Sequence, residues 1–201
     1  DMSKWKASKL SFVFGIDVSK DNIENSSDGA CSRYLRDNPY EISCIFLHGD
    51  SSKNIRNGNA YINAKDVTIS NVIFGQAEKK NTMPSAVQRN YNKGINGFDI
   101  SSCQFAIHYM CESIKTYYNF LQNVSECTKV GGYFIGTTYD GRTLFNKLKL
   151  KKGGESLAII KNNRKVWEIQ KNYLDSEMAD DATSIGLSIT VYQESINQYL
   201  D

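Results

Sequence analysis

Four side chains that follow one short apolar segment are the clearest candidates for chemistry in this sequence. The segment, residues 98–103, comes after a turn-forming Asn96-Gly97 pair and is too short for a helix, so it predicts a buried strand. The side chains just past it are Gln104, Phe105, His108 and Tyr109. In an open α/β sheet, ligands bind in the crevice outside the carboxyl ends of the strands. An amide, two aromatic faces and one imidazole, without a carboxylate pair or a metal-ligand spacing, favour binding of a flat heterocycle over hydrolysis.

The elements that follow are expected to support this crevice. Residues 112–129 predict one helix whose apolar residues lie three and four apart, so its tyrosines are expected in the core. These apolar residues are Ile114, Tyr117, Tyr118, Leu121, Val124 and Cys127. Gly131-Gly132 is expected to end this helix, and residues 133–138 predict the next strand. Tyr139 comes after that strand, where it would border the same crevice and stack on a base, unless it merely lies on the surface.

Two acidic residues follow two earlier predicted strands, residues 10–16 and 42–48. Asp17 closes the first strand, where an acidic residue binds ribose hydroxyls in nucleotide-binding α/β folds, although Asp is also a good helix N-cap. Asp50 follows the second strand, where a carboxylate can accept a hydrogen bond from the adenine amine, although Asp is also frequent in turns. Both residues are therefore cofactor candidates with a local structural alternative.

The remaining segments predict an α/β chain with an antiparallel extension. A helix begins within residues 1–6, residues 20–35 form a helix interrupted at 25–29, and residues 64–74 have helical spacing. Residues 83–96 predict a polar loop, which is either a lid or an insertion. A short basic helix is expected over residues 141–150, followed by strands over 158–161, 166–170 and 187–192. The basic run 147–152 with Arg142 is either a solvated helix face or an RNA-backbone contact.

Composition limits the classes of protein that need to be considered. A chain of 201 residues can form one domain that buries about 70% of its unfolded surface. With 24 basic and 22 acidic residues, net charge alone does not demand a nucleic acid partner, so an RNA contact would need a local patch. Five cysteines without a close Cys-x-x-Cys pair indicate reduced thiols in a cytosolic protein. No apolar segment approaches the roughly 18 residues that span a bilayer, and the charged N-terminal residues do not resemble a signal peptide.

Several longer motifs carry a resemblance to a known family. The segment Ser-Cys-Gln-Phe-Ala-Ile-His-Tyr at 102–109 and the segment Gly-Gly-Tyr-Phe-Ile-Gly-Thr-Thr at 131–138 closely resemble the messenger RNA cap (guanine-N7) methyltransferases. Segments 28–35 and 191–197 resemble, more narrowly, the methyltransferase domains of capping enzymes from large DNA viruses. The resemblance covers nearly the whole chain in the same order.

This resemblance implies a Rossmann-like class I S-adenosylmethionine-dependent methyltransferase, in an α/β fold. Residues 1–201 are then a single but partial domain, whose first strand, glycine-rich loop and C-terminal strands are missing, and this piece alone is expected to be inactive. Asp1 would close the missing loop, and residues 141–201 would include an antiparallel cap-binding extension. The resemblance places a guanine-binding glutamate just beyond Asp201, and Glu194 falls too early in its segment to replace it.

The resemblance also assigns roles to residues. The cofactor S-adenosylmethionine, which leaves as S-adenosylhomocysteine, would be bound by Asp17, Asp50, Gln104 and Tyr109. The cap would be bound by Lys4, Arg33, Phe105, His108, Tyr109 and Tyr139. Lys4 has the alternative of a solvated helix lysine, and Arg33 that of a surface salt bridge. His108 would contact the guanine, although a lone histidine beside an apolar run is more often a structural group or a general acid-base.

The implied reaction moves a methyl group from S-adenosylmethionine to guanine N7 of the RNA 5′ cap, with no metal and no general base. Guanine N7 is an unprotonated nucleophile near neutral pH, so alignment of the two reactants is the main task of the protein. The expected partners are the capped RNA 5′ end, a fused or associated triphosphatase and guanylyltransferase, and a stimulatory subunit, without a membrane. The location would be the cytoplasm, a viral factory or a virion for a viral protein, and the nucleus for a cellular one. Two alternatives stay open: a non-catalytic RNA-binding or stimulatory module of a larger capping enzyme, and a methyltransferase for small molecules or proteins.

Overall fold

The computed structural model describes residues 2–37, 41–194 and 198–200, which form two compact units. The first unit contains residues 1–102 and 118–135, and the second contains residues 103–117 and 136–201. The chain passes between the units within β3 (Phe98–Gln104), α6 (Ile114–Cys127) and β4 (Thr128–Thr137). Asp1 and Asp201, for which the resemblance predicts positions beside a loop and a glutamate, lie outside the described residues. The single methyltransferase domain stays a prediction.

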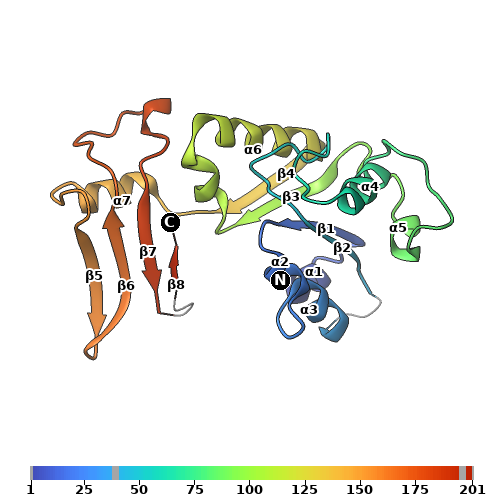
Figure 1. Ribbon diagram of the computed structural model, residues 1–201, viewed down its shortest axis with the longest axis horizontal. Coiled ribbons are helices and arrows are strands. Elements are labelled where there is room, and N and C mark those ends of the chain that lie inside the picture. The colour runs from blue at the N-terminus through green and yellow to red at the C-terminus, as the bar shows by residue number, and fades with distance from the viewer. Residues whose placement is uncertain (1, 38–40, 195–197, 201) are drawn as a thin grey trace. The chain divides into compact units, whose positions relative to one another are not determined.

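The first unit is built on two parallel strands, as the sequence predicts. β1 (Phe12–Asp17) pairs with β2 (Ser43–His48) in a register that runs from Phe12 opposite Ser43 to Asp17 opposite His48. Two short helices, α2 (Lys20–Glu24) and α3 (Ala30–Asp37), form the crossover between the strands, and they lie with α1 (Met2–Ala7) on one side of them in Figure 1. The Phe46 ring anchors this layer, because the rings of Trp5 and Tyr34 each lie 6.4 Å from it.

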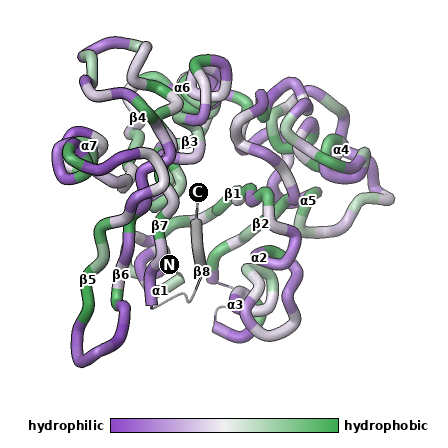
Figure 2. Tube along the Cα trace, turned by 60° about the vertical axis from the view of Figure 1, so that its left-hand side comes forward, coloured by the Kyte–Doolittle hydropathy of each residue, from purple (hydrophilic) through white to green (hydrophobic). Residues whose placement is uncertain are grey.

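The opposite face of β1 and β2 forms the main core. Ile45 and Leu47 of β2 pack with Val72 and Ile73 of α4 (Ala64–Ile73), and none of the four exposes more than a few per cent of its surface. Figure 2 shows the hydrophobic colour of β1 and β2 that this burial requires. The sequence prediction of a loop over residues 83–96 is wrong in part. Residues Ser85–Arg89 form the helix α5, because the buried Val87 attaches this segment to the same core.

β3 and β4 form a second two-stranded sheet. Gly97 turns the chain into β3 with a φ of +81°, and a side chain there would approach the backbone nitrogen of Lys129 to 2.6 Å. At the other end of the strands, the Phe105 N–H donates to the Thr137 carbonyl at 2.9 Å. Since the two beginnings are neighbours and the two ends are neighbours, β3 and β4 run in the same direction.

The two expectations for this sheet need correction. The expected burial of residues 98–103 is wrong: none of the residues of β3 is buried, and Ile100 is 45% exposed. Only Phe98 reaches the core of the first unit, through ring contacts of 6.0 Å with Phe12 and Phe14. The expected helix stop at Gly131-Gly132 is also wrong, because α6 ends at Cys127 and the glycines lie within β4. The glycines instead permit close approach, since a side chain at Gly132 would lie 2.8 Å from the Asp99 carbonyl.

The buried face of α6 differs from the predicted one. Its buried residues are Phe120, Asn123 and Cys127, whereas Tyr118, which the spacing predicts in the core, is 66% exposed. Asn123 is buried because its side chain satisfies the backbone of the loop after β2. It donates to the carbonyls of Ser51 and Lys53 and accepts from the Ile55 N–H, at 2.7–2.9 Å. A polar residue at the centre of the buried face is invisible to a hydrophobic pattern.

The second unit contains an antiparallel sheet and one covering helix. The strands β5 (Ser156–Lys161), β6 (Arg164–Lys171), β7 (Ile189–Gln193) and β8 (Gln198–Leu200) pair in that order, and α7 (Gly141–Leu148) covers one face. Leu148, Ile169 and Val191 are the buried centre of this packing. The three predicted strands and the basic helix are confirmed, whereas β8 was not predicted.

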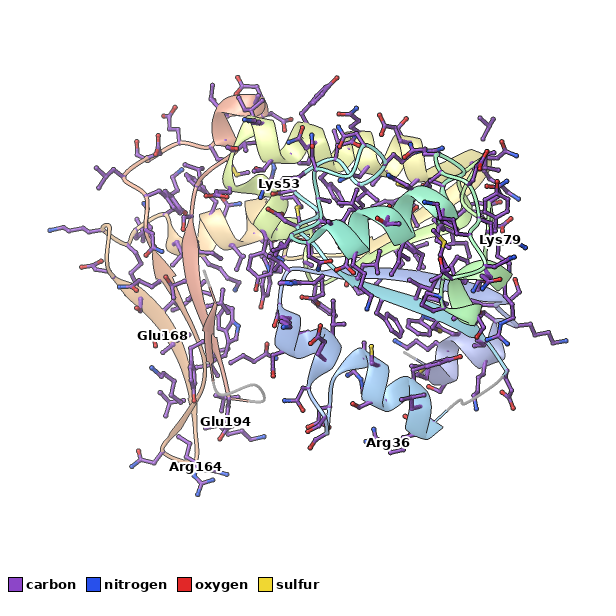
Figure 3. The ribbon with its side chains drawn as sticks, turned by 45° about the vertical axis from the view of Figure 1, so that its right-hand side comes forward. Arg36, Lys53, Lys79, Arg164, Glu168 and Glu194 are labelled. Carbon is purple, nitrogen blue, oxygen red and sulfur yellow. The ribbon has the colours of Figure 1, made fainter. Side chains whose placement is uncertain are left out.

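A bulge at Val166 shifts the faces of the hairpin formed by β5 and β6. Ile159 is opposite Trp167 but Ile160 is opposite Lys165, so Val166 has no partner on β5. The extra residue brings Lys165 to the face that carries Glu168, and the two form an ion pair of 2.5 Å. The turn at the tip, residues 162–163, has two Asn residues with positive φ and is strongly hydrophilic (Figure 2). Arg164 is labelled beside this tip, and Glu168 further along β6, in Figure 3.

Lys171, at the end of β6, is the buried charge of this unit and is only 3% exposed. Its ammonium group donates to the carbonyls of Lys151 and Asp175 at 3.2 Å each and lies 4.6 Å from the centre of the Tyr173 ring. Lys151 follows α7, so this lysine joins β6 to the end of the helix and to the 175–181 loop.

The cysteines and the helices bear on two further sequence observations. All five cysteines are free, four of them half-buried and Cys127 buried, and burial raises the pKa of the Cys44 thiol to about 11. Within the part of the chain that the structure describes, no helix is long and apolar enough to cross a bilayer.

Candidate functional site

The first unit places Asp17 and Asp50 at neighbouring strand ends. The Gly49 N–H donates to the Asp17 carbonyl at 2.9 Å, which extends the parallel pairing of β1 and β2 by one step. The His48 ring nitrogen Nε2 lies 2.9 Å from the Val18 carbonyl and holds the turn after β1 against β2. Two carboxylates therefore lie at one edge of the sheet, as the sequence predicts. The part played by His48 was missed, because nothing in the pattern relates it to Val18, 30 residues away.

The Asp17 carboxylate is held by local donors but is not the helix cap. Its Oδ1 accepts from the Ser19 N–H at 2.8 Å, and the Asn22 amide lies 3.2–3.3 Å from both oxygens. The N-cap of α2 is Ser19, whose hydroxyl accepts from the Asn22 N–H, so the N-cap alternative for Asp17 is wrong. The side chain is only half-buried, and its second oxygen has lone pairs left for a ligand hydroxyl.

The Asp50 carboxylate is ionised and fixed. Its Oδ1 accepts from the N–H and the hydroxyl of Ser52, at 2.9 and 2.6 Å, and the Lys53 ammonium lies 3.1 Å from Oδ2. Burial opposes ionisation, but the hydrogen bonds from Ser52 and the charge of Lys53 outweigh it and lower the pKa of Asp50. These contacts are those of an acidic turn residue, and they also orient an acceptor at the end of β2.

The second unit begins its candidate site with Gln104 and Phe105. The Thr137 hydroxyl donates to the side-chain oxygen of Gln104 at 3.0 Å, and the Phe105 N–H donates to both the carbonyl and the hydroxyl of Thr137. Phe105 has a φ of +53°, a conformation that is costly for an aromatic residue, and 69% of its surface is exposed. The strain is maintained by the bonds to Thr137, a residue that sequence reasoning did not single out.

His108 lies between two tyrosine rings. It is in the short 3-10 helix η1 (Ile107–Glu112), with ring-centre distances of 4.3 Å to Tyr109 and 5.2 Å to Tyr139. Its Nδ1 is buried and has no hydrogen-bond partner among the described residues. Burial lowers the pKa of the imidazole below its ordinary value, so the ring is neutral near pH 7. The unused nitrogen of a neutral imidazole can donate one hydrogen bond to a ligand or accept one from it, depending on the tautomer.

Tyr139 is more than a surface residue, because it packs against the buried cluster around Leu148 as well as against His108. The five second-unit candidates, Gln104, Phe105, His108, Tyr109 and Tyr139, thus belong to one pair of neighbouring strand ends and the 3-10 helix between them. They offer an exposed aromatic face, an amide and an imidazole, which is the chemistry of a site for a flat, nitrogen-rich ring.

The two cationic candidates lie on helices of the first unit. Lys4 is exposed on α1 and Arg33 is exposed on α3. No carboxylate forms an ion pair with Arg33 within residues 2–37, 41–194 and 198–200, so the surface salt bridge expected as its alternative is not found there. Their binding roles stay predictions.

The comparison with known families decides what class of protein carries these groups. Residues 1–169 match the family described as the mRNA (guanine-N(7))-methyltransferase domain. The chain belongs to this family. The matched region contains both candidate strand ends of the first unit and the whole aromatic and imidazole cluster of the second. The resemblance drawn from the 102–109 and 131–138 motifs is therefore confirmed.

Individual cap methyltransferases and a capping enzyme are similar to the chain. It is 28% identical over 203 residues to a probable mRNA-capping enzyme of Acanthamoeba polyphaga mimivirus. The aligned region covers 98% of this chain and 16% of the mimivirus protein. It is 25% identical to mRNA cap guanine-N(7) methyltransferase 1 of Arabidopsis thaliana, over 77% of this chain and 34% of that protein. An mRNA cap guanine-N(7) methyltransferase of Drosophila melanogaster is also 25% identical, over 74% of this chain and 29% of that protein. The chain thus spans between about one sixth and one third of the length of these relatives.

Proposed function

We propose that the protein methylates N7 of the guanine that caps an RNA 5′ end, with S-adenosylmethionine as the methyl donor. In this proposal the α/β elements form a Rossmann-like class I methyltransferase fold. The observation that carries the proposal is the second-unit cluster, in which the buried Nδ1 of His108 has no hydrogen-bond partner among the described residues and the strained Phe105 exposes its ring. Both features are costly for a protein on its own, and a bound purine compensates for both.

The guanine is the ligand that fits this cluster. Stacking of a base on an exposed aromatic ring is worth about 1–3 kcal/mol, and Phe105 offers such a ring. His108 contributes a hydrogen bond through its imidazole, and its lowered pKa keeps a positive charge away from the nucleophilic N7. Tyr109 and Tyr139 hold the imidazole by ring contact on two sides. Unprotonated N7 needs no general base, so these residues bind and orient the guanine and move no proton.

The donor fits the carboxylates of the first unit. Asp17 retains an oxygen for ribose hydroxyls, and Asp50 presents a fixed, ionised acceptor for the adenine amine. S-adenosylmethionine, when bound, supplies a methyl group that its sulfonium already activates. Gln104 and Tyr109 are proposed to complete the set of cofactor-binding residues. A cation–π interaction between the Tyr109 ring and the sulfonium would contribute about 0.5–2 kcal/mol to binding. Alignment of two reactants can supply roughly 7–11 kcal/mol of a barrier, which is the contribution expected from these residues together.

The protein is proposed to act with other cap-forming activities. The similar mimivirus protein is named a probable mRNA-capping enzyme, and this chain matches only 16% of it. A triphosphatase and a guanylyltransferase, fused or associated, would provide the guanosine-capped RNA that this activity consumes.

The proposal is tested by methyl transfer from radiolabelled S-adenosylmethionine to three RNAs of identical sequence. These carry an unmethylated guanosine cap, a 5′ triphosphate, or a cap already methylated at N7. We expect the full-length protein to label only the first RNA, and nuclease digestion to release the label as N7-methylguanosine. Equal labelling of the triphosphate RNA, or label at another position, would overturn the proposal.

His108→Ala is the informative variant in the same assay, with Tyr118→Phe as the control. Tyr118 is an exposed aromatic residue of α6 for which no ligand role is proposed. Loss of transfer in the first variant and full transfer in the second is the expected result. An equal loss of activity and of melting temperature in His108→Ala would instead assign a structural role to the imidazole.

A further inference from the structure

A group of cations on and after α7 is not used by the proposed methyl transfer. Residues 141–154 contain five basic side chains and no acidic one. We call these five side chains the α7 basic surface: Arg142, Lys147, Lys149, Lys151 and Lys152. Four of the five are exposed and Lys151 is half-buried.

An ordinary solvated helix face does not account for this surface. Such faces mix both signs of charge, as Lys20 and Glu24 do on α2 with a 3.6 Å ion pair. On the α7 basic surface, Arg142 forms an ion pair with Asp180, but no described carboxylate pairs with the side chains of Lys147, Lys149 or Lys152. These three ammonium groups therefore have no ion-pair partner within the described part of the chain, which leaves them available to an anionic ligand.

The surface is also held in one shape. The Lys151 N–H donates to the Leu148 carbonyl at 2.9 Å, and the Lys151 carbonyl accepts from the buried Lys171 ammonium at 3.2 Å. The Lys152 N–H donates to the Glu155 carboxylate at 2.8 Å. Because backbone bonds fix the turn that carries these lysines, binding costs little ordering beyond that of the side chains themselves.

A shallow polar pocket lies on the same helix. It has a volume of about 300 Å³, and its lining residues are Arg142, Phe145, Asn146, Lys149, Glu177 and Met178. It combines two cations and the carboxylate of Glu177 with an amide and apolar edges, so it is not a site for a small anion alone. The groups suit a nucleotide, whose phosphate, sugar and base differ in polarity.

We propose that the α7 basic surface binds the ribose-phosphate backbone of the single-stranded RNA that follows the cap. This inference rests on the proposed function, because the RNA is the chain attached to the methylated guanine. α7 begins two residues after Tyr139, whose ring contacts His108, so the helix leads away from the guanine cluster within the same unit. Its eight residues span about 12 Å, which is long enough to contact more than one phosphate of an extended strand.

The test compares two triple variants with the same change of charge. The first is Lys147→Gln, Lys149→Gln and Lys152→Gln, and the control is Lys65→Gln, Lys79→Gln and Lys80→Gln, three exposed lysines of the first unit. Fluorescence anisotropy measures the dissociation constants of the full-length protein for a labelled 20-nucleotide uncapped RNA, for the same RNA with a guanosine cap, and for the cap dinucleotide GpppG. Each titration is repeated from 50 to 200 mM salt.

We expect the first variant to bind both RNAs about tenfold more weakly at low salt, and to bind GpppG as the wild type does. Three lost phosphate contacts at about 0.7 each reduce the slope of log K against log salt by about 2. The control is expected to match the wild type with all three ligands. RNA affinity that is unchanged in the first variant, or equally reduced in the control, overturns the inference.

Two further outcomes separate this inference from the proposed function and from another partner. If the wild type fails to bind GpppG while RNA binding still depends on the three lysines, the proposed function fails and the RNA surface stands. If the lysines instead control binding to phosphatidylserine vesicles and not to RNA, the surface is a lipid contact and the inference is wrong.

Discussion

The imidazole of His108 lies 5.2 Å from the ring of Tyr139, at an interplanar angle of 47°. This contact joins the 3-10 helix after β3 to the segment that leads into α7, so the ring has little freedom to turn away. Its Nδ1, for which the described part of the chain offers no hydrogen-bond partner, is consequently held in a fixed position. A neutral, fixed imidazole whose Nδ1 has no partner among the described residues supports the ligand role proposed for His108.

The pH dependence of stability reports on this imidazole. Its pKa is lower in the folded protein than the ordinary value of about 6.5, so the unfolded chain takes up the proton more readily. Stability is therefore lost progressively as the pH falls from about 6.5 towards the folded pKa. We expect urea unfolding at pH 7.5 and 5.5 to show a smaller loss for His108→Ala than for the wild type. An identical loss in both proteins would mean that the imidazole does not titrate as its burial implies.

The charge of Asp17 is expected to control cofactor affinity. Asp17→Asn keeps the oxygen that accepts from Ser19 but removes the charge, and a hydrogen bond to a charged group is worth about 1.5–3 kcal/mol. We expect S-adenosylhomocysteine to bind roughly 10- to 100-fold more weakly in isothermal titration, with the melting temperature nearly unchanged. Asp21→Asn, an exposed change on the neighbouring α2, serves as the control and should bind normally. Normal binding by Asp17→Asn would exclude the ribose role.

Replacement of Phe105 by glycine is expected to affect protein stability and cap binding in opposite directions. Phe105→Gly removes a strained positive φ that costs about 1–2 kcal/mol in an ordinary residue, so thermal stability should stay equal or rise despite the loss of an aromatic ring. Guanosine-cap affinity should fall about tenfold, because the stacking face is lost. Phe105→Leu keeps the strain and removes the aromatic face, so it should lose affinity without gaining stability. A destabilised glycine variant with full cap affinity would contradict both parts.

Lys171 is expected to stabilise the second unit. Lys171→Met fills similar space but removes the donor to the carbonyls of Lys151 and Asp175, and a hydrogen bond from a charged group contributes about 1.5–3 kcal/mol. The free energy of unfolding in urea should therefore fall by about 2 kcal/mol or more. Lys152→Met is the control, since its exposed ammonium has no described ion-pair partner. Equal stability of the two variants would mean that the desolvation cost of the buried ammonium cancels its hydrogen bonds.

The strands could be predicted from the sequence because their residues alternate or run apolar between turn signals. β1, β2 and β6 appear within two residues of the expected positions, and the ends of β1 and β2 carry the two predicted carboxylates. The errors arise where a residue serves a neighbour that is distant in the sequence. Gly131 and Gly132 allow β4 to approach β3, and Asn123 binds a loop about 70 residues away, and neither purpose is visible in local spacing.

Some residues of the candidate site could likewise be predicted from the sequence, and others could not. Residues with their own chemistry, such as His108 and Phe105, could be selected from their types and their place after a strand. Their proposed roles came from the family resemblance and stay predictions. The supporting residues Ser52 and Thr137 could not be selected, because a hydroxyl becomes significant only once the fold shows which carboxylate, amide or backbone group it orients.

The unmatched residue at Val166 has a consequence for any attempt to shorten or extend this hairpin. Deletion of Val166 would restore a continuous ladder and transfer Lys165 to the side of the sheet that α7 covers, where a charged head group is poorly tolerated. Changes to the distal part of the hairpin should therefore succeed only in steps of two residues per strand. In a library of variants with different hairpin lengths, soluble expression should then be high when an even number of residues is added to or removed from each strand, and low when the number is odd. This alternation would follow from the single unpaired residue, Val166.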